Sequence, residues 1–68
     1  MTAEEEKTIR MEIARLRLEH RDLDSAIDAM STSGKYGPLQ MQRLKKKKLA
    51  IKDHITRLED SLFPDIIA

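Results

Sequence analysis

The sequence has no cysteine and no tryptophan, and only two glycines, two prolines, one tyrosine and one phenylalanine among its 68 residues. Without cysteine, the chain has no disulfide framework, no thiolate nucleophile and no thiolate metal ligand. The scarcity of glycine and proline, with 37% charged residues and a bias toward lysine, arginine, glutamate and leucine, indicates long helix in a single small domain. A multidomain enzyme is excluded.

Long apolar runs are also absent. No run approaches the roughly 20 residues that a membrane-spanning helix needs, and Met1 to Arg10 carry three consecutive glutamates in place of the basic and apolar regions of a signal peptide. We therefore expect a cytoplasmic protein without a membrane partner. The 13 basic and 12 acidic side chains nearly cancel, so nucleic acid or anionic lipid would be attracted only by a local cluster of charge.

What the chain does contain is two stripes of mostly apolar residues, each stepping by three and four positions. The average spacing of 3.5 residues predicts left-handed coiled-coil packing. When one stripe is read forwards and the other backwards, each pair of residue numbers sums to 71, from Met30 with Met41 to Ile9 with Leu62. The pattern predicts an all-α, antiparallel two-helix hairpin. Its seam consists of Ile9, Ile13, Leu16, His20, Leu23, Ile27, Met30, Met41, Leu44, Lys48, Ile51, Ile55, Leu58 and Leu62.

Local signals mark the ends of the helices. Thr2 and Glu5 form a capping box, Gly34 suits a left-handed turn, Pro38 suits the first position of a helix, and Pro64 cannot extend one. The apolar tail after it either folds over the open end of the hairpin or anchors a partner protein. We predict a single hairpin over residues 1–68, with a helix over about 2–31, a turn over about 32–37, a helix over about 38–63 and a tail over 64–68.

Charged residues beside the seam give a second prediction of the register, because flanking positions of an antiparallel pair face each other. Three facing pairs are complementary and one is not. The complementary pairs are Arg10 with Glu59, Asp24 with Lys45 and Glu19 with His54, and the like-charge pair is Arg17 with Lys52.

Two seam members, His20 and Lys48, are polar. We expect His20 to be structural, bonded to a carboxylate such as Glu19 or Asp24 or to a group on another subunit; the alternatives are a pH switch and a metal ligand. His54 lies about one turn away on the facing helix, but zinc would need two further donors. We therefore expect no metal and no cofactor. Lys48 is expected to lay its stem along the seam and pair with Asp24.

A second apolar set lies outside the seam. Two helices of this size leave much of their surface wet, and such chains usually gain stability by association. We therefore expect a homo-oligomer in which hairpins assemble into a helical bundle. The candidate oligomer surface consists of Met11, Ala14, Leu18 and Leu49.

The basic run at residues 43–48 suggests an alternative, because clustered cations release counterions from a phosphate backbone. On a helix these side chains point in different directions, and no aromatic stacking platform accompanies them, so we prefer solvated or ion-paired lysines. The alternative nucleic-acid contacts are Arg43, Lys45, Lys46 and Lys47.

The chain resembles the small bacterial YdcH-like family, a domain of unknown function, from about residue 13 to residue 62. The resemblance implies a cytoplasmic helical hairpin without an assigned catalytic activity. Its motif elements are Glu19-His20, Leu23-Asp24, Leu44-Lys45, Lys48-Leu49 and Lys52-Asp53.

No chemistry is identifiable in the sequence, which has neither a serine beside a plausible base nor a glycine-rich phosphate loop. We therefore expect a non-enzymatic protein that self-associates and acts as a protein-interaction or regulatory module. Nucleic-acid binding through the basic run is the alternative function.

Overall fold

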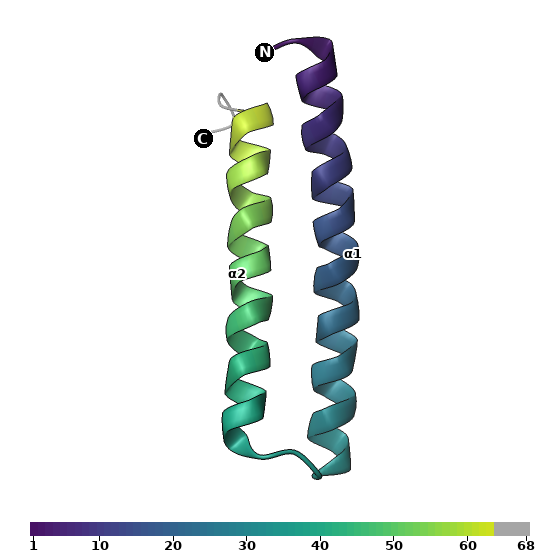
Figure 1. Cartoon of the computed structure of the whole chain (residues 1–68), viewed down its shortest axis with the longest axis vertical. Coiled ribbons are helices and arrows are strands. Elements are labelled where there is room, and N and C mark those ends of the chain that lie inside the picture. The colour runs from purple at the N-terminus through teal and green to yellow at the C-terminus, as the bar shows by residue number, and fades with distance from the viewer. Residues whose placement is uncertain (64–68) are drawn as a thin grey trace.

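The computed structural model describes residues 1–63 and confirms a helical hairpin (Figure 1). Helix α1 spans Ala3–Ser33 and helix α2 spans Pro38–Leu62, and the two helices lie side by side and antiparallel. Residues 1–63 contain no strand. The molecule is elongated, with principal extents of 48, 24 and 16 Å. Neither α1 nor α2 has a stretch long and apolar enough to cross a membrane.

Helix α1 begins with a side-chain cap. Thr2 is extended, and its hydroxyl oxygen accepts a hydrogen bond from the backbone N–H of Glu5 at 3.1 Å, which satisfies one of the donors that a helix start leaves open. Glu4, Glu5 and Glu6 occupy the first turn, where the helix dipole favours negative charge. The acidic run therefore stabilises this end of α1.

The end of α1 lies two residues beyond the predicted position. The hydroxyls of Thr32 and Ser33 donate to the backbone carbonyls of Asp28 and Met30, each at 3.0 Å, so these polar residues bond back to the helix. Gly34 then adopts φ 66°, and its N–H bonds to the Met30 carbonyl at 3.3 Å. A left-handed residue at this position stops the helix and is least costly as glycine.

Helix α2 begins where the chain loses a backbone donor. Gly37 is extended and precedes Pro38 in the first turn, where the missing N–H of proline would have no helical partner in any case. At the other end, the Phe63 N–H still bonds to the Glu59 carbonyl at 2.9 Å, and the helix ends at Leu62. The predicted tail, residues 64–68, lies outside the described residues.

The core is the seam between the two helices. Ile13, Leu16 and Ile55 form its buried cluster, with exposed fractions of 7%, 4% and 9%, and Ile27 is buried separately nearer the turn. The other ten predicted seam residues are half-buried, and elsewhere in residues 1–63 only Glu12 and Glu59 are half-buried while the others are exposed. Both helices therefore direct one stripe inwards and leave the rest of their described surface in water.

This packing predicts how substitutions of two leucines differ. Leu16→Ala removes the most buried side chain and should lower the free energy of unfolding by about 2–5 kcal/mol. Leu39→Ala, at a residue that is 59% exposed, should change it by no more than about 0.5 kcal/mol. Urea unfolding followed by circular dichroism measures both. Equal effects of the two substitutions would contradict this seam.

Candidate interaction surfaces

Two ion pairs cross the hairpin. Arg17 Nη2 lies 3.0 Å from Glu59 Oε2, and Lys48 Nζ lies 2.5 Å from Asp24 Oδ1. The predicted contact of Lys48 with Asp24 is therefore formed. These pairs tie the two helices together on the polar border of the seam.

The predicted pair of Arg10 with Glu59 is wrong. The side chains of a helix lean toward its N-terminus. In this antiparallel hairpin, residues at the same level have numbers that sum to 71. Two facing side chains therefore lean toward each other when their numbers sum to more than 71, and away from each other when the sum is smaller. Glu59 therefore meets Arg17. Arg10 bonds instead to Glu6 at 3.0 Å, and its guanidinium lies 5.4 Å from the centre of the Phe63 ring, a cation–π contact.

The predicted pair of Asp24 with Lys45 is wrong for the same reason, since Lys45 leans away toward the turn and Lys48 takes its place. Glu19 is not bonded to His54 either. It pairs with Arg15 at 2.5 Å, and Arg15 also pairs with Glu12. These contacts lie within α1, so they stabilise the helix and do not define the register.

His20 occupies the seam without the predicted carboxylate partner. Its Nε2 atom is buried and makes no hydrogen bond to any described residue. Both carboxylates considered for it are engaged elsewhere, Glu19 by Arg15 and Asp24 by Lys48. The described part of the chain has no group of three or more histidine, cysteine, aspartate or glutamate side chains placed to hold a metal ion. His20 is therefore a polar seam residue with an unmet hydrogen bond.

The outer face of α1 carries exposed apolar side chains. Met11 and Leu18 are 64% and 59% exposed, and their spacing of seven places them on one line along the helix, away from α2. Ala14 lies between them in sequence and lines a shallow pocket together with Met11. Leu49, the fourth predicted member of this surface, is 60% exposed but belongs to α2 and lines a different pocket.

That second pocket, here called the lysine pocket, has a volume of about 430 Å³ and lies between the helices. It receives three basic side chains from α2. The lining residues are His20, Ile27, Lys45, Lys48, Leu49 and Lys52.

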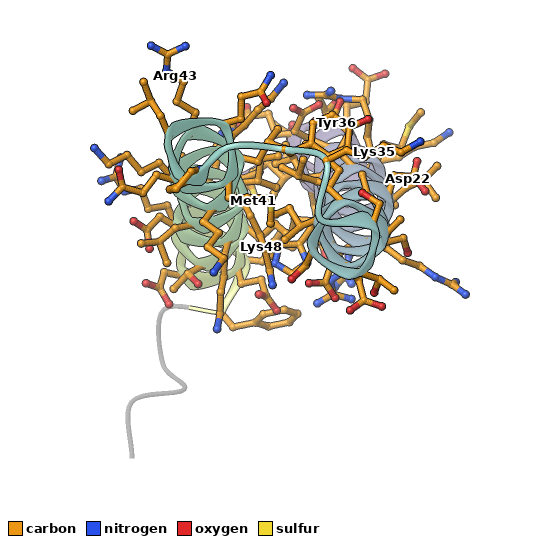
Figure 2. All side chains as sticks on the ribbon, turned by 90° about the horizontal axis from the view of Figure 1, so that it is seen from below. Asp22, Lys35, Tyr36, Met41, Arg43 and Lys48 are labelled. Atoms are coloured by element: carbon orange, nitrogen blue, oxygen red, sulfur yellow. The ribbon has the colours of Figure 1, made fainter. Side chains whose placement is uncertain are left out.

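The side chains of the basic run lie on different sides of α2. Of the four predicted nucleic-acid contacts, only Lys45 lines the lysine pocket, whereas Lys47 lines another pocket together with Glu19 and Asp22. Figure 2 shows Arg43 extending from the side of α2 opposite to Lys48. The run therefore does not form one continuous basic stripe.

Comparison with known proteins places the chain in a family. Residues 13–59 match DUF465, described as a protein of unknown function. The chain belongs to the DUF465 family. The YdcH-like family is this same family, so the resemblance read from the sequence is confirmed. A search of curated proteins and a search of solved structures each found no match to this chain.

The part that matches DUF465 contains most of the seam and the whole lysine pocket. It also contains both ion pairs that cross the hairpin. Met11 lies before the matched part and Leu18 lies inside it. The DUF465 description assigns no activity.

Replacing His20 tests the cost of its unmet hydrogen bond. A buried polar atom without a partner costs about 1–3 kcal/mol, so His20→Leu should raise the free energy of unfolding by an amount in that range. His54→Leu, at an exposed position of α2, is the matched control and should change little. Urea unfolding measures both, and destabilisation by His20→Leu would show that the imidazole has a partner.

The Asp24–Lys48 pair predicts a pH dependence. The hydrogen bond and charge of Lys48 lower the pKa of the Asp24 carboxyl from its ordinary value, with a smaller effect of His20. A carboxyl with a lowered folded-state pKa stabilises the fold above its unfolded pKa, near 4, and loses this contribution as the pH falls through the folded value. The stability difference between the wild type and Asp24→Asn should therefore be present at about pH 6 and shrink as the pH falls below about 4. Thermal unfolding across this range measures it, and a constant difference would contradict it.

Proposed function

We propose that this DUF465 chain is a non-enzymatic protein whose α1 outer face binds a second copy, so that the hairpin acts as a self-associating interaction module. The observation that carries the proposal is the exposure of Met11 and Leu18, which are 64% and 59% exposed on one line of α1. Among residues 1–63 the hairpin buries only four side chains. Association would cover apolar surface that two helices alone leave in water.

The spacing of these residues fits a two-fold interface. If two α1 helices cross antiparallel about an axis level with Ala14, Met11 of each copy meets Leu18 of the other. The small Ala14 side chain near the axis allows the helices to approach closely. Arg15, the next residue, is already paired with two glutamates of its own helix, so its charge is compensated within each copy.

Four hydroxyl groups of the two helices favour a non-enzymatic role. Those of Thr8, Thr32, Thr56 and Ser61 each donate to the backbone carbonyl one turn earlier in their own helix. A hydroxyl that donates its proton to a backbone carbonyl does not donate it to a general base, which a nucleophilic hydroxyl needs. The hydroxyls of these four residues form hydrogen bonds within their own helices.

Nucleic-acid binding through Arg43, Lys45, Lys46 and Lys47 remains the second candidate, with less support. Affinity for a phosphate backbone grows with the number of cations that reach it together, and these side chains lie on different sides of α2.

Light scattering tests the proposed interface. The wild type should have a mass that is a multiple of 7.9 kDa, and Met11→Asp/Leu18→Asp should be a monomer because charges cannot be buried unpaired at the contact. The matched control is Tyr36→Asp/Leu39→Asp, which adds the same charges at residues that are 46% and 59% exposed and should leave the mass unchanged. A monomeric wild type, or equal masses for the two variants, would exclude the proposal.

A further inference from the structure

We propose that the lysine pocket is a binding site for the phosphate group of a small organic phosphate monoester. The proposal concerns a different part of the hairpin from the self-association surface and does not depend on it. It rests on the origin of the pocket, the charges that line it, the unmet hydrogen bond of His20 and the apolar part of its wall.

The pocket arises from a polar break in the seam. Lys48 occupies a seam position, but its ammonium reaches Asp24 at 2.5 Å and its side chain remains 34% exposed. A lysine that directs its charged end to the rim does not fill the space that an apolar seam residue would fill. The buried cluster of Ile13, Leu16 and Ile55 lies on one side of this break, and Ile27 is buried on the other.

The charges of the pocket are incompletely neutralised. Lys45, Lys48 and Lys52 are spaced by three and four residues, so one face of α2 presents all three. Lys48 is paired with Asp24, but neither Lys45 nor Lys52 has a carboxylate oxygen of residues 1–63 within 4.0 Å. Like charges at this spacing destabilise a helix. An anion bound between the lysines would attract each ammonium group and so offset their mutual repulsion.

The same pocket is lined by His20, whose Nε2 atom is buried and unpaired. Buried polar atoms nearly always have a partner, so an exception calls for an explanation. When it carries the proton, Nε2 is a donor that needs an acceptor such as an anion oxygen. Nε2 lies beneath the pocket surface, so an anion in the pocket would reach it only if the imidazole rotates. The unmet hydrogen bond and the uncompensated lysines are separate observations that favour the same kind of ligand.

The size and the remaining wall indicate what the anion is attached to. A volume of about 430 Å³ lies within the range of small-molecule sites and is much larger than one phosphate group needs. Ile27 and Leu49 form the apolar part of the wall. Phosphate offers three oxygens and up to two negative charges to several ammonium groups, and an apolar body attached to it would cover Ile27 and Leu49.

A nucleic-acid backbone fits this site less well. It needs cations along an extended path, whereas Arg43 and Lys47 lie on another side of α2. Asp24, beside the pocket, would also repel a second phosphate. A single phosphate with a compact body therefore fits the pocket better than a polymer.

The test uses phenyl phosphate as the probe and inorganic phosphate for comparison, with binding followed by backbone and imidazole NMR shifts of the full chain. Phenyl phosphate should shift His20, Leu49 and Lys52 and bind more tightly than inorganic phosphate. Lys45→Gln/Lys52→Gln should weaken its binding at least about tenfold, because two of the charges that bind the phosphate are lost. Circular dichroism checks that this variant and the lysine control variant described below both fold.

The matched control is Lys46→Gln/Lys47→Gln, which removes the same charge from the same helix outside the pocket and should weaken binding much less than Lys45→Gln/Lys52→Gln, because neither side chain lines the pocket and only a screened, longer-range charge effect is lost. Equal loss in the two variants, or no shift at His20, would overturn the proposal. So would tighter binding of a short DNA duplex that both variants weaken alike. The monomeric variant Met11→Asp/Leu18→Asp should bind phenyl phosphate like the wild type, so failure of either proposal is recognised separately.

Discussion

The packing of one apolar stripe on another along the seam is the interaction on which the rest of this structure depends. Ile13, Leu16 and Ile55 are buried only because each helix shields the other. An isolated helix has no such partner, and helices of this composition gain most of their stability from tertiary packing. The seam also determines the register, and the register decides which charged residues come within reach of each other. Stability, ion pairs and pockets therefore follow from this one contact.

The lean of helical side chains turns this register into a definite set of ion pairs. Arg17 and Glu59 lean toward each other across the seam and pair at 3.0 Å, whereas Arg10 leans beyond Glu59 and lies over the Phe63 ring. A shift of the register by one heptad would separate Arg17 from Glu59 and Lys48 from Asp24 at once. These exposed pairs contribute little to stability. Their effect is to favour one alignment of two similar stripes over its neighbours.

Much of the fold can be predicted from the sequence, because the heptad spacing and the sum of residue numbers depend only on helix geometry. The cap at Thr2 and the turn at Gly34 are predictable because each needs one particular residue type. The facing pairs Arg10–Glu59 and Asp24–Lys45 are predicted wrongly, because level alone does not account for the direction in which helical side chains lean, whereas the contact of Lys48 with Asp24 is predicted correctly. Lys52 was missed as a member of the lysine pocket. Its spacing of four and seven residues from Lys48 and Lys45 was a usable signal for one helix face. The continuous run of lysines at 45–48 instead groups neighbours in sequence that lie on different sides of the helix.

The two polar residues of the seam, His20 and Lys48, interrupt its packing and line the pocket proposed as a binding site. His20 and Lys48 lie close together in the hairpin and interrupt the apolar stripe between the Ile13 cluster and Ile27. Two apolar residues there would close the pocket and extend the core, and replacing buried polar groups by apolar ones of similar size commonly stabilises a protein. Residues 1–63 bury only four side chains, so this interruption is large relative to the described core. It falls where these residues gather three lysines and an imidazole around the lysine pocket, as expected of a site that exchanges stability for binding.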